Sequence, residues 1–360
     1  MRILILTPTT LPSITGNAIT AERWRRSLQD KGMTVTVMAT QELDARDLLG
    51  KLQRFEPDLI HVHHGFRSGH LLLDSHVTSE WDRLPFVVSP GGTDINYDFE
   101  IKEKREIITK VYQKARFIIA QGPEMAKRLG DLFPTLHERI IHVQKTFCWL
   151  GNETFDLKKA VGCKEGEILF FLPAGIRPVK GNLECLKVFG QICSLRPRVR
   201  IVFAGPALDR NYAEQFDREL KNHRPFATWI PFIPPEAMRS AYESSDIVLN
   251  TSFSEGLSNA LLEAIAAGRP VLASNIPGNW WPFLGEDGKE PAGLLFDVDN
   301  PKDLIVQALK LIDDENLRET CIRTGRERAS CWPTPEDEAN GLIRVYETAI
   351  TSSHSTIQPV

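Results

Sequence analysis

Two glutamates in residues 252–279, SFSEGLSNALLEAIAAGRPVLASNIPGN, combine residue types and spacing that could do chemistry. Glu255 stands on a predicted loop, and Glu263 follows eight residues later inside a predicted helix. The start of this helix, with Ser258 or Asn259 as its cap, offers backbone amides and the positive end of the helix dipole to an anion. A diphosphate flanked by hydroxyl-rich groups would use both features: amides for the phosphates and carboxylates for the hydroxyls. The alternative is that Glu255 is a solvated loop residue and Glu263 a helix residue favoured by the dipole.

Strands and helices alternate along the whole chain, and these elements must position the two glutamates. The predicted strands are nearly continuous apolar runs, such as RILILTP, DLIHVHH, ILFFLPAG and DIVLNTS, which are typical of a parallel sheet covered on both faces. The alternation lapses once, so we predict two Rossmann-like doubly wound α/β domains with a ligand cleft between the carboxyl ends of their sheets. The expected segments are an acceptor-side domain at 1–150, a linker at 151–166, a donor domain at 167–330, a C-terminal helix at 331–350 returning toward the first domain, and a disordered tail at 351–360.

Composition narrows the class of protein. The 360 residues carry a formal net charge of −4 without blocks of like charge, which argues against a nucleic-acid partner and a polybasic membrane anchor. Six cysteines without a C-x-x-C pair favour reduced thiols. The N-terminal MRILILTPTT is too short for a secretory signal, and no apolar run approaches the roughly 20 residues of a membrane span. We therefore expect a cytoplasmic protein without an integral membrane segment; its oligomeric state is not indicated.

The motifs of several enzyme classes are missing from the sequence. It contains no G-x-G-x-x-G, Walker A, nucleophile-elbow or H-E-x-x-H motif, so it lacks the usual signs of a dehydrogenase, a kinase, a serine hydrolase or a zincin.

The string around the two glutamates resembles the E-x7-E signature of retaining GT-B glycosyltransferases of the family-four type, written EG…LEA.A.G.PV.AS. The resemblance spans nearly all of the chain. It implies a nucleotide-sugar donor, with a UDP-sugar favoured, held by Glu255 and the following amides at the sugar and by Glu263 at the ribose. The donor-binding residues that it implies are Gly16, Asn17, Gly205, Glu255, Gly256, Leu257, Ser258, Asn259 and Glu263.

Two further segments fit this resemblance. GIRPVKGN, residues 175–182, is similar to the family's basic diphosphate loop, in which Arg177 and Lys180 would stabilise the departing diphosphate. The family's arginine usually stands further upstream, so Lys180 is the firmer assignment and Arg177 is alternatively a surface cation. SITGNAITAERW follows the first strand, where Gly16 permits close backbone approach and Asn17 offers an amide.

SPGGTDIN, residues 89–96, departs from the family pattern. Many relatives carry a histidine just before Gly-Thr-Asp, but Gly91 stands there in this chain, so no histidine role carries over. Thr93, Asp94 and Asn96 remain as polar candidates. Asp94 is the best of them for a catalytic role, with the capping of a turn as its alternative.

Histidine and tryptophan pairs suggest other sites. In HVHH, strand alternation places only His61 and His63 on one face, so a cleft role for His63 or His64 is preferred over metal binding. Trp280 and Trp281, on a predicted loop, could stack on an acceptor or pack the domains together, and packing is slightly favoured. We expect neither an essential metal nor a cofactor.

The segments TGNAITAERW, GGTDIN, RPVKGN and SNIPGN are similar to those of glycosyltransferase one-domain-containing proteins and, more loosely, of bacterial selenosugar synthases. The resemblance implies a metal-independent hexosyltransferase-type enzyme that moves a sugar to an unknown acceptor with retention. Alternatives are selenosugar- or thiosugar-synthase-like transfer to a small anion, a non-catalytic nucleotide-sugar-binding protein, and an epimerase of the same fold.

Overall fold

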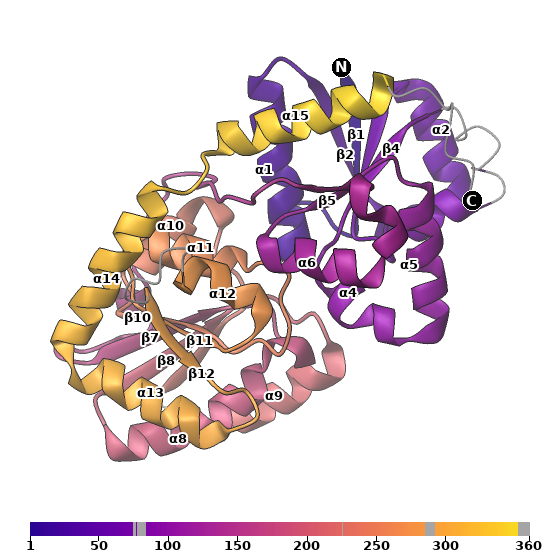
Figure 1. Cartoon of the computed structure of the whole chain (residues 1–360). Coiled ribbons are helices and arrows are strands. Elements are labelled where there is room, and N and C mark those ends of the chain that lie inside the picture. The colour runs from indigo at the N-terminus through magenta and orange to yellow at the C-terminus, as the bar shows by residue number, and fades with distance from the viewer. Residues whose placement is uncertain (75–76, 78–83, 225, 285–291, 352–360) are drawn as a thin grey trace. The chain divides into compact units, whose positions relative to one another are not determined.

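The computed structural model describes residues 1–74, 77, 84–224, 226–284 and 292–351, drawn in colour in Figure 1. By contacts, the chain divides into unit 1, Met1–Thr146 with the described residues from Pro333 on, and unit 2, Phe147–Trp332. Apart from Thr351, the expected tail lies outside the described residues.

Unit 1 is built on a six-stranded parallel sheet in the order β2-β1-β3-β4-β5-β6. Its strands are β1 (Arg2–Thr7), β2 (Thr34–Ala39), β3 (Leu59–His63), β4 (Phe86–Ser89), β5 (Ile118–Ala120) and β6 (Ile140–His142). Its helices are α1 (Gly16–Asp30), α2 (Ala45–Phe55), α4 (Thr93–Asn96), α5 (Lys102–Lys114), α6 (Pro123–Leu132) and α15 (Pro335–Thr351), with 3-10 turns η1 (Thr40–Glu42), η2 (Gly69–Leu73), η3 (Asp98–Glu100) and η4 (Pro134–Arg139).

Unit 2 repeats this plan with the strand order β12-β11-β10-β7-β8-β9, again parallel (Figure 1). Its strands are β7 (Ile168–Pro173), β8 (Val199–Ala204), β9 (Ala227–Ile230), β10 (Ile247–Asn250), β11 (Val271–Ser274) and β12 (Gly293–Phe296). Its helices are α7 (Leu157–Ala160), α8 (Asn182–Leu195), α9 (Arg210–Asn222), α10 (Met238–Glu243), α11 (Asn259–Ala266), α12 (Pro277–Leu284), α13 (Pro301–Asp313) and α14 (Glu315–Ser330), with 3-10 turns η5 (Pro178–Lys180) and η6 (Pro235–Ala237).

Each sheet separates two apolar cores, which explains the continuous apolar runs of the strands. In β1, Leu4 and Leu6 pack into one core, while Ile3 and Ile5 pack into the other. Unit 2 does the same in β7, where successive residues alternate between its two cores. The expected doubly wound α/β architecture is confirmed.

The strand order reverses between β1 and β3 in unit 1 and between β7 and β10 in unit 2. In parallel α/β sheets, ligands bind outside the carboxyl ends of the strands at such a reversal. The loops after these four strands are therefore where a site is expected.

Residues 151–166, which the sequence predicts as a linker, lie within unit 2. Leu157 is fully buried there, and the backbone N–H groups of Phe155 and Leu157 donate to the hydroxyls of Ser240 and Ser244 at 3.0 and 2.9 Å. The predicted C-terminal helix is α15, which belongs to unit 1 and packs against α1 (Figure 1).

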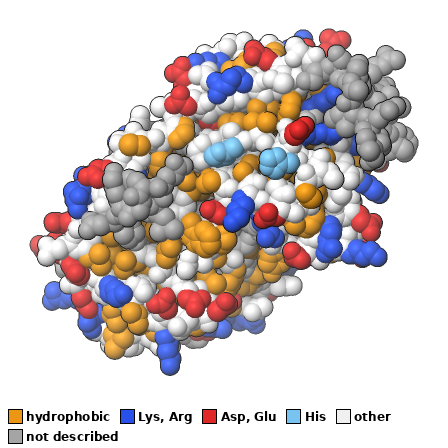
Figure 2. Space-filling model, in the orientation of Figure 1, with side chains coloured by type: hydrophobic (Ala, Val, Ile, Leu, Met, Phe, Trp, Pro, Cys, Tyr) orange, Lys and Arg blue, Asp and Glu red, His pale blue; other side chains and the backbone are white. Residues whose placement is uncertain are grey.

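The surface of the described chain mixes both signs of charge. Figure 2 shows Lys and Arg side chains interspersed with Asp and Glu over the visible face, as the balanced composition suggests. Among the described helices, none is both long enough and apolar enough to cross a bilayer.

A buried ion pair fixes α15 to α1. The carboxylate of Glu338 accepts hydrogen bonds from Arg23 Nε at 2.8 Å, Arg23 Nη2 at 3.0 Å and Trp24 Nε1 at 3.0 Å. Only 1% of the Arg23 side chain and 3% of the Glu338 side chain are exposed. The two charges are therefore shielded from water, and each side chain compensates the buried charge of the other.

We predict that Glu338→Ala destabilises unit 1 by about 3–5 kcal/mol, because it deprives a buried guanidinium of its carboxylate. Differential scanning calorimetry measures the loss. Glu336→Ala is the control, since Glu336 is 67% exposed and its pair with Lys31 should contribute less than about 1 kcal/mol. Equal losses in the two variants would contradict this role of the buried pair.

Candidate functional site

The loops after β7 and β10 are bonded to each other in unit 2. Phe253 N–H donates to the carbonyl of Val179 at 2.9 Å, and the Thr251 hydroxyl donates to the carbonyl of Lys180 at 2.8 Å. Gly181 makes this approach possible: its φ is +63°, and an added Cβ would lie 2.5 Å from the Thr251 carbonyl oxygen. The crossing of these loops places Lys180 beside the segment that carries the first glutamate.

Lys180 and Glu255 form an ion pair at this crossing, with 16% and 12% of their side chains exposed. Glu255 also accepts hydrogen bonds from Ser252 Oγ at 2.7 Å and Asn250 Nδ2 at 3.4 Å. Burial alone would raise the pKa of Glu255, but the charge of Lys180 and the hydrogen bonds from Lys180 and Ser252 bring that pKa below its ordinary value, with a further contribution from Arg177. The carboxylate is therefore ionised at neutral pH, among two cations.

Helix α11 begins at Asn259, three residues after Gly256. Ser258 occupies the N-cap position, as the sequence predicts, but its side chain makes no capping hydrogen bond. Its hydroxyl accepts instead from Asn250 Nδ2 at 3.0 Å. Ser258 and Leu257 are buried and Asn259 is half-buried. Because Asn250 Nδ2 donates to both Glu255 and Ser258, the N-cap of α11 lies close to the Lys180–Glu255 pair.

Glu263 lies further along α11 and is half-buried. Its Oε2 accepts a hydrogen bond from Tyr242 Oη of α10 at 2.9 Å. Burial and the charge of Glu263 raise the pKa of Tyr242 well above its usual value, so the phenol remains a donor. Tyr242 holds this carboxylate in place.

Two residues at this site escape the sequence interpretation. Tyr242 has no local motif, because it reaches Glu263 from a separate helix. Gly278 belongs to the segment SNIPGN, which resembles the family, but the sequence assigns no role to this glycine. An added Cβ at Gly278 would lie 2.2 Å from the Glu255 carbonyl oxygen. Gly278 thus lets the first turn of α12 pack directly on the Glu255 backbone.

Gly205, a predicted donor residue, follows β8. Its φ is +147°, and an added Cβ would lie 2.7 Å from the backbone of Ala174 and Gly175. Its carbonyl accepts from Trp229 Nε1 at 2.9 Å. Gly205 therefore supports the loop after β7 by close backbone packing.

Trp280 and Trp281 lie in helix α12, so the prediction of a loop is wrong. Pro277 is the first residue of this helix, a position that proline favours, and the fully buried Phe283 anchors the helix to the core of unit 2. Trp280 Nε1 donates to Asn275 Oδ1 at 2.8 Å, and the Trp281 ring lies 5.6 Å from that of Trp332, centroid to centroid. These contacts are packing within unit 2.

In unit 1, Asp94 joins the loops after β3 and β4. Its fully buried carboxylate accepts from the backbone N–H groups of Gly65 at 2.7 Å, Gly91 at 3.0 Å and Ile95 at 3.1 Å, and from Tyr112 Oη at 3.3 Å. Burial raises the pKa of Asp94, although the backbone hydrogen bonds oppose the rise. These contacts favour the turn-capping alternative over direct chemistry by this carboxylate.

His64 fills the space beside Gly91. An added Cβ at Gly91 would lie 2.8 Å from His64 Cδ2 and 3.3 Å from Asn17 Oδ1. His64 Nε2 bonds to Thr93 Oγ1 at 3.1 Å, and its φ of +81° is a left-handed value rare outside glycine. A histidine from the neighbouring strand end thus occupies the place that a side chain at position 91 would need.

The other predicted residues of unit 1 flank this group. Gly16 is the first residue of α1, which Thr15 caps by accepting from Ala18 N–H at 3.2 Å. Asn96 ends α4 and is half-buried.

The HVHH segment divides between core and sheet edge. His61 bonds to Tyr346 Oη at 2.7 Å and Ser89 Oγ at 2.6 Å and stacks on Trp24, while burial lowers the pKa of His61 to about 3. His63 meets Trp24 edge-on at 5.0 Å between ring centroids. In the part of the chain that the structure describes, no three His, Cys, Asp or Glu side chains are grouped to hold a metal.

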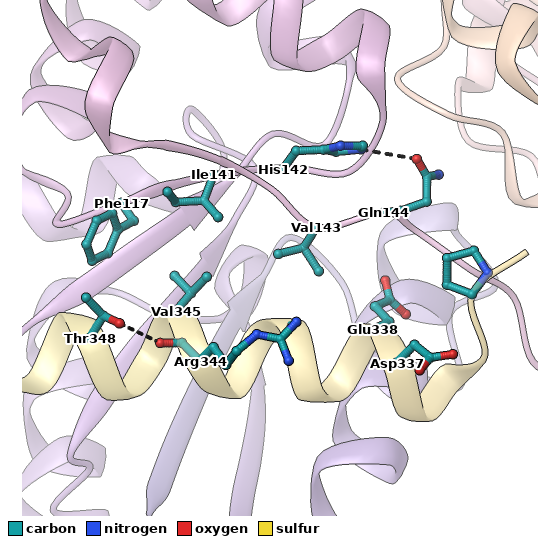
Figure 3. A pocket seen from close by; sticks show the side chains of 12 residues that line it. Phe117, Ile141, His142, Val143, Gln144, Asp337, Glu338, Arg344, Val345 and Thr348 are labelled. Carbon is teal, nitrogen blue, oxygen red and sulfur yellow. Dashed lines mark hydrogen bonds between the residues drawn. The ribbon is translucent and has the colours of Figure 1, made fainter. Parts of the chain in front are cut away.

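A separate pocket of about 420 Å³ in unit 1 is lined by none of the predicted residues (Figure 3). It lies between the edge strand β6 and α15, with Phe117, Ile141, Val143 and Val345 forming its apolar part. Glu338, which lines it, is already bonded to α1.

Comparison with known proteins finds a family match within unit 2. Residues 153–328 match the sequence profile of the family described as glycosyl transferases group 1. The chain carries a group 1 glycosyl transferase domain. The predicted relationship is thereby confirmed at the level of group 1 glycosyl transferases, and the matched region contains both the Lys180–Glu255 pair and Glu263.

Relatives extend the likeness over the whole chain. Glycosyltransferase 1 domain-containing protein 1 of Xenopus tropicalis is 27% identical over 355 residues, covering 95% of this chain and 97% of the relative. Among solved structures, sucrose-phosphate synthase from Thermosynechococcus elongatus aligns with a TM-score of 0.81 at 14% identity, over 98% of this chain and all of that one. HepE of Anabaena, in complex with UDP and glucose, aligns with a TM-score of 0.76 at 17% identity, over 97% and 100%. The fold is GT-B.

We predict that Gly181→Ala destabilises unit 2 by more than the roughly 1 kcal/mol of a left-handed alanine, because its Cβ also strikes the Thr251 carbonyl. Gly162→Ala is the matched control, since Gly162 has a φ of +60° but open space around the added Cβ. Calorimetry compares the two variants. A loss no larger in Gly181→Ala than in Gly162→Ala would mean that the loop crossing is not tight.

Proposed function

We propose that this protein transfers a sugar from a nucleotide-sugar donor, with a UDP-sugar favoured, to an acceptor. The observation that carries the proposal is the Lys180–Glu255 ion pair, held beside the first turn of α11 at the strand reversal of unit 2. The Anabaena relative of the same fold, in complex with UDP and glucose, supports the choice of donor.

The proposed donor-binding residues form two groups, backbone amides that suit the phosphates and carboxylates that suit hydroxyl groups. The amides of Gly256, Leu257, Ser258 and Asn259 and the start of α11 suit the phosphates, since amide groups and the helix dipole favour an anion. Glu255 suits a sugar hydroxyl, and Glu263, oriented by Tyr242, suits the ribose.

Lys180 and Arg177 serve the leaving group. In the reaction, the bond between the sugar C1 and the diphosphate oxygen breaks, and its electron pair stays with the diphosphate. Lys180 and Arg177 stabilise that growing charge, so the chemistry asks for no metal. The ion pair with Glu255 holds Lys180 in position for this role.

The acceptor supplies the new bond to C1, and its proton passes to the departing diphosphate. We propose retention, with attack from the side of the leaving group and no protein nucleophile. This agrees with the environment of Asp94, whose oxygens already accept four hydrogen bonds. We assign Gly16, Asn17, Thr93 and His64 of unit 1 to the sugar and acceptor, with Asn96 at the margin, and place the reaction in the cytoplasm.

We predict that one nucleotide raises Tm clearly in a thermal-shift panel of UDP, GDP, ADP and their common sugar conjugates. A ligand at 100 times its Kd should add about 2.7 kcal/mol of apparent stability. Lys180→Ala should abolish the shift, because it removes the cation that faces the diphosphate. The absence of any shift with folded wild-type protein would overturn the donor assignment. A shift without turnover under any acceptor would favour a non-catalytic binding protein.

We also predict that Glu263→Ala weakens nucleoside diphosphate binding by about 1.5–3 kcal/mol, as expected for a lost hydrogen bond to a charged group. Isothermal titration calorimetry measures the change in Kd. Glu327→Ala, an exposed glutamate of the same unit, is the control. Unchanged affinity in Glu263→Ala would remove this residue from the site.

A further inference from the structure

Three polar side chains of unit 1 meet around one ring nitrogen, at the loops after β3 and β4. His64 Nε2 lies 3.1 Å from Thr93 Oγ1 and 3.9 Å from Asp98 Oδ2. The first distance is a hydrogen bond, and the second is too long for one. A hydroxyl and a carboxylate oxygen therefore lie close to the same nitrogen, and these three side chains are here called the His64 group.

A backbone contact decides which nitrogen of His64 carries the proton. The backbone N–H of Arg67 donates to His64 Nδ1 at 3.1 Å, so Nδ1 accepts and holds no proton. The proton of the neutral ring is then on Nε2, which donates to Thr93 Oγ1. The Thr93 oxygen accepts this bond and keeps its own O–H hydrogen for another partner. The contacts within the described ranges supply no such partner, and Thr93 is only half-buried.

Asp98 supplies a hydrogen-bond acceptor beside this donor. Only 6% of the residue is exposed, and its Oδ1 accepts from Lys104 Nζ at 2.6 Å. Its Oδ2 is buried and has no hydrogen-bond partner among the described residues. A buried polar atom without a partner is costly, and most such atoms in proteins are paired with protein, water or a ligand. The free lone pairs of Oδ2 therefore require a group that carries a hydrogen.

The backbone of His64 shows that the surrounding structure imposes this arrangement. Its φ of +81° is a left-handed value that is unfavourable for a residue with a Cβ, and its side chain is fully buried. Gly91 leaves the space for the ring, since an added Cβ there would lie 2.8 Å from His64 Cδ2. Strained conformations of this kind cluster at sites that bind ligands.

We propose that the His64 group binds a hydroxyl group, and that this hydroxyl belongs to the acceptor of the transfer reaction. The bound hydroxyl donates its hydrogen to Asp98 Oδ2 and accepts the hydrogen of Thr93, which uses both hydrogen-bonding capacities of an alcohol. His64 is a positioning residue, because its Nε2–H makes Thr93 a donor toward the ligand.

The same contacts select against a small anion. A carboxylate offers only lone pairs, so it has no hydrogen for Asp98 Oδ2. An alcohol, such as a hydroxyl of a sugar or a polyol, is therefore the acceptor class that fits. The assignment to the acceptor rests on the proposed function, whereas binding of an alcohol does not.

The test measures binding of glycerol, sorbitol and methyl α-glucoside to the full chain by saturation-transfer NMR, with acetate as the anionic competitor. At least one alcohol should bind the wild type, and acetate should not displace it. In Asp98→Asn, Lys104 retains the amide oxygen and an N–H faces the alcohol, so the Kd should rise about tenfold or more.

Thr93 offers a matched pair of variants. Thr93→Val removes the donating hydroxyl and should raise the Kd of the alcohol about threefold to tenfold, whereas Thr93→Ser keeps the hydroxyl and should stay within about twofold of the wild type. Thr109→Val, at a half-buried threonine of α5, is the control and should leave the Kd unchanged.

His64→Gln and His64→Leu separate positioning from packing. Both variants lose the ring and keep the left-handed backbone, so their stabilities should fall together. Glutamine retains an N–H for Thr93 and leucine does not, so the alcohol should bind about threefold or more tightly to His64→Gln than to His64→Leu. Equal affinities in the two variants would remove the positioning role of His64.

An alcohol can also bind beside Glu255 in unit 2, so the series is repeated in Glu255→Gln. Binding that persists in Glu255→Gln and weakens in Asp98→Asn belongs to the His64 group. The proposal is overturned if none of the three alcohols binds the wild type, or if Asp98→Asn and Thr93→Val bind as the wild type does. Buried water then satisfies Asp98.

Nucleotide binding in the same variants distinguishes this proposal from the proposed function. Asp98→Asn and Thr93→Val should keep the nucleotide Kd, whereas Lys180→Ala should lose the nucleotide and keep the alcohol. Mass spectrometry should detect transfer of the sugar to the bound alcohol, and binding without transfer would overturn its assignment as the acceptor. Alcohol binding by a wild type that responds to no nucleotide would overturn the donor assignment and leave the hydroxyl-binding site standing.

Discussion

The ion pair between Lys180 and Glu255 depends on a single constraint, the contact between the loops after β7 and β10. Taking two charges out of water is expensive unless additional hydrogen bonds satisfy them. Here Ser252 and Asn250 supply those bonds, and Gly181 allows the backbones to meet. Because β7 and β10 flank the strand reversal, their loops come from opposite halves of the sheet yet end side by side. A preorganised cation at this point is what a departing diphosphate requires.

Unit 1 carries a comparable concentration of unfavourable features at its own sheet edge. His64 adopts a left-handed backbone conformation, Asp94 is buried as it joins two loops, and Thr7 Oγ1 and His63 Nδ1 have no hydrogen-bond partner among the described residues. Strain and unsatisfied polarity persist only where the surrounding structure enforces them, and they gather at functional sites. The interior of the same unit shows the opposite: Glu338 and His61 are buried, but each has well-formed hydrogen bonds. Buried polar groups in the core of unit 1 are therefore hydrogen-bonded, whereas the sheet edge holds strained backbone and unpaired polar atoms.

The HVHH segment illustrates how one short motif serves several roles. His61 points into the core, where Tyr346 and Ser89 hold it as a neutral ring. His63 shares that face but lies at the strand end, and His64 leaves the strand to stand beside Gly91. The three imidazoles of this segment therefore lie in three different environments. Their spacing suits a strand end better than a metal site, because alternation turns neighbouring side chains apart.

The sequence by itself determined the order of strands and helices, the loop position of Glu255 and the basic loop of Lys180, because apolar runs, glycines and helix starts are local signals. It did not determine contacts between distant segments. Tyr242 at Glu263, Gly278 on the Glu255 backbone and His64 in the space beside Gly91 each join separate elements. Packing also decides that Trp280 and Trp281 are helical and that Leu157, in a predicted linker, is buried. Such contacts depend on how whole elements dock, which only the tertiary structure decides.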